Sequence, residues 1–162
     1  PLVRQVRARA LQLSKQFGLI DRITPAYRTR YRRTHWQSRD AAFQYFKRRA
    51  LFKQFDDACL NDYIQYGMTH NETGYHLRFD ADIEYAIYRT LPHTFKDYPQ
   101  KLRVPTTLIY GDKSDVIRAS DRRYMQRQYG IQSFKIPGSH MFPFEHPLAT
   151  AALILKVTQE KI

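Results

Sequence analysis

Two polar residues stand out because each follows a short strand-like run and has a side chain suited to acid–base chemistry. Asp115 comes just after the run at 106–110, in the loop sequence GDKSD. His140 comes just after the run at 133–136, in the sequence PGSH. A carboxylate beside a histidine can fix the tautomer of the imidazole, so that the histidine acts as a general base. Asp112, in the same loop as Asp115, is the alternative acid, but an aspartate there more often serves the geometry of the turn.

The elements around these residues predict that Asp115 and His140 lie close together. The run at 106–110 is unbroken and β-prone, which is typical of a strand buried on both faces. A helix is expected at 120–129, and the second strand follows it. Parallel strands joined by a helix place their carboxyl ends at one edge of a sheet. Two strands are not a stable sheet by themselves, so we expect the sheet to continue in other residues.

The remaining segments predict a helical region followed by this α/β unit. The pattern changes at 101–105, where we place a structural boundary. Trp36 and the tyrosines near it are candidates for lining a substrate passage, but we favour the interpretation that they form the core of the helical region. An amphipathic helix is expected within 1–17, ended by Gly18, and further helices are expected from Ser38 to about Arg49 and from Asp56 or Asp57 to about Gly67. A turn at 71–74, an extended piece at 75–79 and a helix at 81–90 should follow. A closing helix is expected at 148–157, after Pro147.

The composition indicates a globular protein with an uneven charge. The chain has 162 residues and a net charge of +12, and residues 1–50 hold 13 of the 27 Lys and Arg residues but two of the 15 acidic ones. A basic surface attracts anions of any kind, so a basic binding module for nucleic acid or acidic partners, formed by residues 1–50, is an alternative hypothesis. No apolar run is long enough to cross a membrane. The single cysteine, Cys59, suits a reducing compartment, and we expect a cytoplasmic protein.

Two motifs, taken in order, make the chain resemble the C-terminal part of an α/β-hydrolase. The first is G-x-x-S-D at 111–115, and the second is PGSHMFPFEHP at 137–147. The segments WQSRDAAF, LNDYIQYG and GYHLRFDADIEYAIYRTLP, at 36–43, 60–67 and 74–92, resemble the lid of bacterial members. The resemblance implies an α/β fold in which a helical lid or cap, residues 1–100, precedes the last strand–helix–strand–helix of the parallel sheet, residues 101–162. The domain is expected to be incomplete.

The resemblance also implies a Ser–His–Asp hydrolase of ester-like or other acyl bonds, with Asp115 as the acid and His140 as the base. In the family the nucleophile elbow G-x-S-x-G and the oxyanion loop lie upstream, and none of the serines of this sequence has such flanking glycines. Because the sequence begins at Pro1, we expect a longer chain, and we expect these residues alone to be inactive. A non-catalytic hydrolase relative is a further alternative.

The expected partners are the missing N-terminal half of the hydrolase core and a small hydrophobic acyl substrate, which an aromatic-rich lid favours. We expect neither a membrane nor nucleic acid as a partner of the hydrolase. No cofactor is required by this chemistry. The histidines and the cysteine show none of the H-x-x-x-H or C-x-x-C spacings of a metal site, so no metal is expected.

Overall fold

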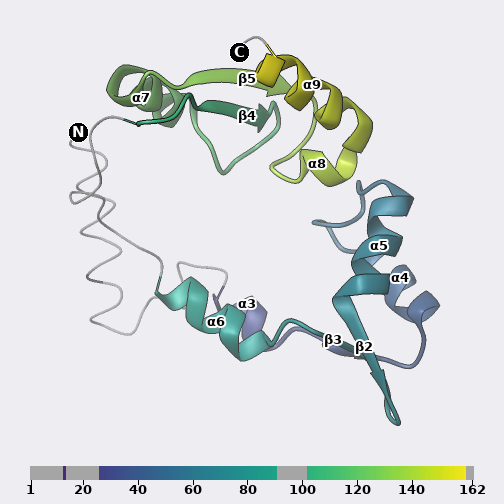
Figure 1. Cartoon of the computed structure of the whole chain (residues 1–162). Coiled ribbons are helices and arrows are strands. Elements are labelled where there is room, and N and C mark those ends of the chain that lie inside the picture. The colour runs from purple at the N-terminus through teal and green to yellow at the C-terminus, as the bar shows by residue number, and fades with distance from the viewer. Residues whose placement is uncertain (1–12, 14–25, 91–101, 160–162) are drawn as a thin grey trace. The chain divides into compact units, whose positions relative to one another are not determined.

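The computed structural model describes residue 13, residues 26–90 and residues 102–159 (Figure 1). Apart from Leu13, the helix predicted within residues 1–17 lies outside the described residues. The described chain forms two compact units. One contains the described residues up to Ser38 together with 66–90, and the other contains 39–65 together with the described residues from Leu102 on. That residues 1–100 form a lid stays a prediction.

The first unit is built around a small antiparallel sheet in the order β1–β3–β2. Its elements are α3 (Ala26–Arg30), β1 (His35–Trp36), β2 (Met68–Asn71), β3 (Gly74–Leu77) and α6 (Ala81–Arg89). The turn predicted at 71–74 is confirmed, because Asn71 pairs with Gly74 at the end of a β2–β3 hairpin. The strand β2 was not expected from its sequence, MTHN, which is mostly polar. The side chain of Trp36 is 0% exposed, in agreement with a core residue.

Two of the predicted helices begin at aspartate caps. The Asp80 side chain accepts hydrogen bonds from the N–H groups of Asp82 and Ile83, which starts α6. The second unit opens with α4 (Arg39–Lys47) and α5 (Asp57–Gly67). Asp56, rather than Asp57, caps α5, since its Oδ1 accepts hydrogen bonds from two N–H groups at the start of that helix. Aromatic and aliphatic side chains fill the core between and beside α4 and α5: Ala42, Phe46, Phe55, Leu60 and Ile64 are buried.

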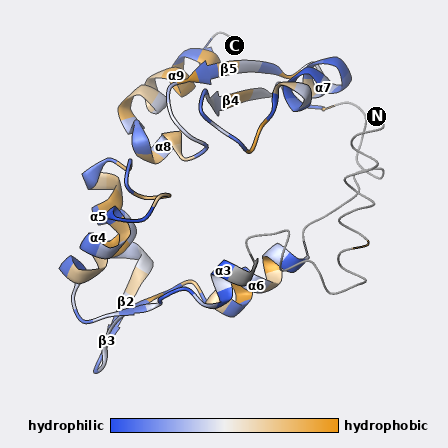
Figure 2. Ribbon diagram, turned by 180° about the vertical axis from the view of Figure 1, so that it is seen from behind, coloured by the Kyte–Doolittle hydropathy of each residue, from blue (hydrophilic) through white to orange (hydrophobic). Residues whose placement is uncertain are grey.

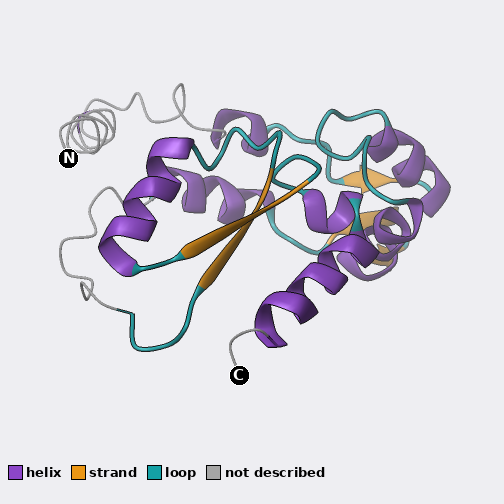
Figure 3. Cartoon of the chain, turned by 90° about the horizontal axis from the view of Figure 1, so that it is seen from above, coloured by secondary structure: helices purple, strands orange, loops and turns teal. Residues whose placement is uncertain are grey.

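The rest of the second unit confirms the predicted strand–helix–strand–helix order. It consists of β4 (Thr107–Gly111), α7 (Ala119–Tyr129), β5 (Gln132–Ile136), a short α8 (Phe142–Glu145) and α9 (Pro147–Gln159). Strands β4 and β5 are parallel neighbours, from the pair Thr107–Gln132 to the pair Gly111–Ile136. They run side by side in Figure 1, and in the view from above in Figure 3 one strand crosses over the other. As predicted, α7 ends at Gly130, which takes the left-handed conformation. The fold class is therefore α/β, and the parallel sheet of the described residues has two strands.

One expectation about β4 is wrong in this structure. Its apolar sequence predicts a strand buried on both faces, yet Leu108, Ile109 and Tyr110 are half-buried. Burial on both faces requires helices packed on each face of the sheet. In the part of the chain that the structure describes, the extensive contacts of β4 are with the neighbouring strand β5 rather than with helices. Helix α9 is also rich in hydrophobic residues (Figure 2), and Leu148 and Leu155 on it are 86% and 60% exposed. Among the described residues, no helix is both long and apolar enough to span a membrane.

Candidate active site

The loops that follow β4 and β5 are joined to each other by backbone hydrogen bonds beyond the ends of the strands. The N–H of Asp112 donates to the carbonyl of Ile136 at 2.8 Å, and the N–H of Lys113 donates to the carbonyl of Gly138 at 3.0 Å. The parallel pairing thus extends into the loops. As a result, the two candidate catalytic residues are presented at the same edge of the sheet.

Gly111 allows the two loops to approach this closely. A Cβ atom at this position would lie 2.0 Å from the carbonyl oxygen of Ser139 and 2.4 Å from that of Gly138. Both atoms belong to the backbone, so neither can move aside without shifting the histidine loop. The glycine of the GDKSD sequence therefore serves close packing of backbone against backbone.

The structure brings Asp115 and His140 together. Oδ1 of Asp115 lies 3.7 Å from Nδ1 of His140, which is within the range of an ion pair but longer than a hydrogen bond. The Asp115 side chain is 90% exposed and that of His140 is 41% exposed. The carboxylate of Asp115 thus lies on the Nδ1 side of the ring, which is the side that the orienting acid takes in a catalytic triad.

Asp112 has a different environment from Asp115. Its Oδ1 accepts a hydrogen bond from the N–H of Gly138 at 3.0 Å, across the two loops. This contact uses the carboxylate of Asp112 to hold the backbone of the histidine loop. Of the two aspartates, Asp115 is the one that lies next to the imidazole of His140.

The carboxylate of Glu145 also binds the histidine loop, the loop after β5 that carries His140. The side chain of Glu145 is buried, at 9% exposure. Oε2 accepts a hydrogen bond from the N–H of Ser139 at 2.8 Å, and Oε1 accepts one from the Ser139 hydroxyl. The sequence places Glu145 only near the start of the closing helix. Its contact with Ser139 could not be expected, because the four-residue helix α8 that turns it back toward the loop has no signal in the sequence pattern.

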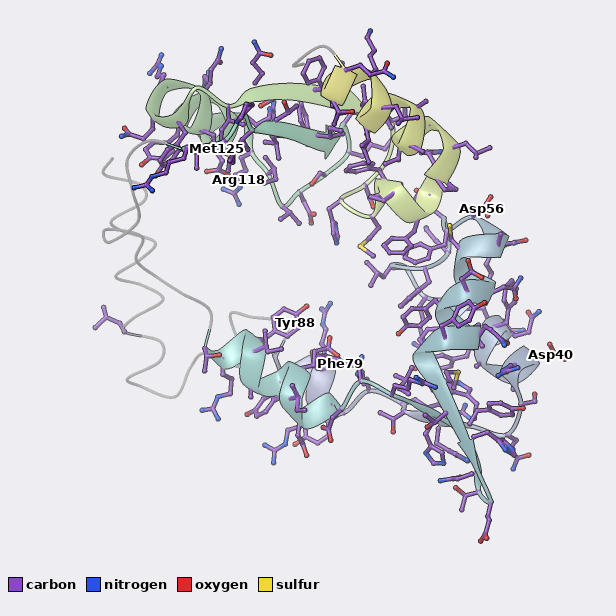
Figure 4. All side chains as sticks on the ribbon, in the orientation of Figure 1. Asp40, Asp56, Phe79, Tyr88, Arg118 and Met125 are labelled. Carbon is purple, nitrogen blue, oxygen red and sulfur yellow. The ribbon has the colours of Figure 1, made fainter. Side chains whose placement is uncertain are left out.

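Residues 39–65 contact the same short helix. The N–H of Asp56, labelled in Figure 4, donates to the carbonyl of Phe144 at 2.8 Å. The rings of Phe55 and Phe144 stack with centroids 5.0 Å apart and planes inclined by 7°. The start of α5 is therefore attached to α8, a few residues after His140 in the chain.

The free thiol of Cys59, in the same unit, is a further group to consider as a nucleophile. Burial raises the pKa of Cys59 above its ordinary value, and the negative charges of Asp56 and Asp62 raise it further. Because the thiolate is the reactive form, Cys59 is not a good candidate for a nucleophile. No group of three or more histidine, cysteine or acidic side chains within the described ranges is arranged to hold a metal ion.

Comparison with known proteins identifies the fold through structure. No family model and no curated protein matches the sequence. Among solved structures, a thioesterase domain from the curacin biosynthetic pathway superimposes with a TM-score of 0.54 and 20% identity, over 75% of this chain and 43% of that one. E-2-(acetamidomethylene)succinate hydrolase superimposes with a TM-score of 0.62 and 15% identity, over 75% of this chain and 46% of that one. An M. tuberculosis esterase, whose structure was refined in a study of its inhibition by transition metals, superimposes with a TM-score of 0.57 and 17% identity. This match covers 96% of this chain and 51% of that one.

These three structures are all α/β-hydrolases. The chain spans about half the length of each of them. At identities of 20% or less the likeness is one of fold, and in the third case it covers nearly the whole of this chain. The chain therefore has the fold of part of an α/β-hydrolase.

Proposed function

We propose that this chain is the C-terminal part of a hydrolase that cleaves ester-like or other acyl bonds. The observation that carries the proposal is the approach of Asp115 Oδ1 to within 3.7 Å of His140 Nδ1, at the carboxyl edge of parallel strands in an α/β-hydrolase fold. An acid and a histidine in this arrangement fit the last two members of a Ser–His–Asp triad, which follow the nucleophile along the chain in this family.

In this proposal His140 is the general base and Asp115 is the orienting acid. The carboxylate of Asp115 holds the proton on Nδ1, which leaves the lone pair of Nε2 to accept the proton of a serine hydroxyl as that oxygen attacks the acyl carbon. The same proton then passes from Nε2 to the leaving group. Asp115 also stabilises the imidazolium that forms between these two steps.

The nucleophile and the oxyanion hole are proposed to come from residues outside this sequence. The chain spans 43–51% of the three matched structures, which leaves room for such residues. The half-buried strand β4 and the exposed leucines of α9 support this, since a larger core would cover them. The proposed substrate is a small hydrophobic acyl compound, and the proposed compartment is the cytoplasm. A thioesterase, a hydrolase and an esterase among the matched structures favour an acyl bond.

The test is to express the full-length protein and to measure its reaction with a fluorophosphonate probe and with short-chain p-nitrophenyl esters. We expect covalent labelling and ester hydrolysis, with both lost in the His140→Ala variant. The 162-residue chain by itself should show neither reaction. An intact, folded protein that gives no labelling and no hydrolysis of esters or thioesters would contradict the proposal.

A further inference from the structure

The contacts of Glu145 form a complete network around the residue that precedes His140. The carboxylate accepts hydrogen bonds from both the backbone N–H and the hydroxyl of Ser139. The Ser139 oxygen in turn accepts a hydrogen bond from the N–H of Met141 at 2.9 Å. The residues on both sides of His140 in the chain are therefore fixed by Glu145, one directly and one through the serine hydroxyl.

The backbone of the same turn closes this network. The N–H of Phe142 donates to the carbonyl of Ser139 at 3.2 Å, and the N–H of Glu145 donates to that of Met141, also at 3.2 Å. Gly138 makes room for the carboxylate, because a Cβ atom there would lie 2.6 Å from Oε2 of Glu145. Gly138 also has a φ of +121°, which is unfavourable for any residue with a side chain.

Both groups of Ser139 that meet Glu145 are donors, so the side chain at position 145 has to accept two hydrogen bonds. The Ser139 hydroxyl donates its one hydrogen to Glu145, while its oxygen accepts a hydrogen bond from the N–H of Met141. The N–H of Ser139 also needs an acceptor. A carboxylate accepts both bonds, whereas a glutamine amide would bring N–H hydrogens to one of the two positions. Hydrogen bonds to an ionised acceptor are also about twice as strong as those between neutral groups.

Asp115, on the loop after β4, is poorly suited to hold the side chain of His140 in place. Asp115 is 90% exposed, and its distance of 3.7 Å from His140 is too long for a hydrogen bond. An exposed contact of this kind contributes little to holding a side chain in place, even when both groups are charged. The place of the imidazole therefore depends mainly on its own loop, whereas in the proposed function Asp115 selects its tautomer.

We propose that Glu145, acting through Ser139, is a positioning residue that holds His140 in reach of Asp115. This inference rests on the proposed hydrolase function. Glu145 does not touch the imidazole. It sets the backbone conformation of the histidine loop, and thus the place from which His140 exchanges its proton.

The experiment uses the full-length protein with Glu145→Gln, Ser139→Ala and the double variant. Ser139→Thr, which keeps the hydroxyl, is the conservative control. Glu84→Gln is a matched control, because it makes the same chemical change at a glutamate of the other unit, where the carboxylate forms an ion pair with Arg32. The readouts are kcat and KM for a p-nitrophenyl ester, the ¹⁵N signals that report the tautomer of His140, and circular dichroism for the fold.

We expect Glu145→Gln and Ser139→Ala each to lower kcat by about 10- to 100-fold with KM changed less than about threefold, the size of effect that a misplaced catalytic group produces. The ¹⁵N signals should show mixed tautomers of His140. The double variant should lose little more than either single variant, because both remove one network. Ser139→Thr and Glu84→Gln should stay within about threefold of the parent, on the same scale.

Wild-type kcat and unchanged His140 signals in a folded Ser139→Ala variant would overturn the inference. If Glu145→Gln does not fold, Ser139→Ala, which deletes a single hydroxyl, decides the matter. If the parent protein has no acyl hydrolase activity, the proposed function fails, while the ¹⁵N signals still report whether Glu145 orders His140. Activity with no response in either readout contradicts the positioning role alone.

Discussion

The loops after β4 and β5 end at the same edge of the sheet, but they hold their polar residues in different ways. In the loop after β5, backbone N–H groups on both sides of His140 donate hydrogen bonds to the side chains of Asp112, Glu145 and Ser139. In the loop after β4, the side chain of Asp115 lies beside the imidazole and is 90% exposed. The two loops also share a close backbone contact at Gly111.

The carboxylates near His140 are of two kinds: some bind the backbone of the histidine loop, and one lies beside the imidazole. Asp112 and Glu145 are carboxylates that bind backbone N–H groups, and their effect is on the shape of the histidine loop. Asp115 contacts the imidazole and makes little contribution to shape. A catalytic group is held to within a fraction of an ångström by its supporting groups, so substitutions in the two classes should affect different measurements.

The largest expected effect is on turnover, from Asp115→Asn. In the full-length protein kcat should fall by about 10⁴-fold, because the amide can no longer hold Nδ1 of His140 in the required tautomer. Asp112→Asn keeps an oxygen that can accept from Gly138, and it should stay within about tenfold of the parent, well below the loss of a triad member. Steady-state kinetics on a p-nitrophenyl ester measure both. A nearly active Asp115→Asn and an inactive Asp112→Asn would reverse the assignment of the acid.

The next effect is on stability, from Gly111→Ala. The added Cβ would meet two backbone oxygens at 2.0 and 2.4 Å, so we expect the free energy of unfolding to fall by about 3 kcal/mol or more. Gly130→Ala is the control, since that Cβ would meet nothing within 4 Å and the cost is that of a φ of +69° alone, about 1 kcal/mol. Urea denaturation compares the two. Equal losses would show that the loops can separate without penalty.

Much of this arrangement could be predicted from local sequence signals. The apolar run at 106–110, the glycine that ends α7 and Pro147 at the start of α9 define the order of elements through periodicity and caps. The approach of Asp115 to His140 follows from the shared edge of parallel strands.

What could not be predicted depends on contacts between segments. The strand β2 has a polar sequence and exists because it pairs with β3 in a hairpin. The bond between Glu145 and Ser139 depends on the four-residue helix α8, which is too short to give a periodic pattern. The half-exposure of β4 reflects what packs against its two faces, and the strand's own residues do not encode that.

A smaller effect on stability is expected from Asp112→Ala. This change leaves the N–H of Gly138, a buried residue, without its acceptor, which should cost about 1–3 kcal/mol. Hydrogen exchange at Gly138 should quicken in the variant, and urea denaturation gives the free energy. Asp112→Asn should recover most of the loss. If Asp112→Ala is as stable as the parent, the interloop bond does not hold the histidine loop.

The smallest effect, and the one that sharpens the comparison most, is on the stability of Asp115→Asn. A side chain that is 90% exposed and 3.7 Å from its partner gains little from that contact, so the free energy of unfolding should change by no more than about 0.5 kcal/mol. For the same reason, raising the salt concentration should affect the parent and the variant alike. Combined with the loss of turnover, an unchanged unfolding curve would separate a chemical role for Asp115 from a structural one. A loss of 2 kcal/mol or more would instead place Asp115 among the groups that shape the loops, with Asp112 and Glu145.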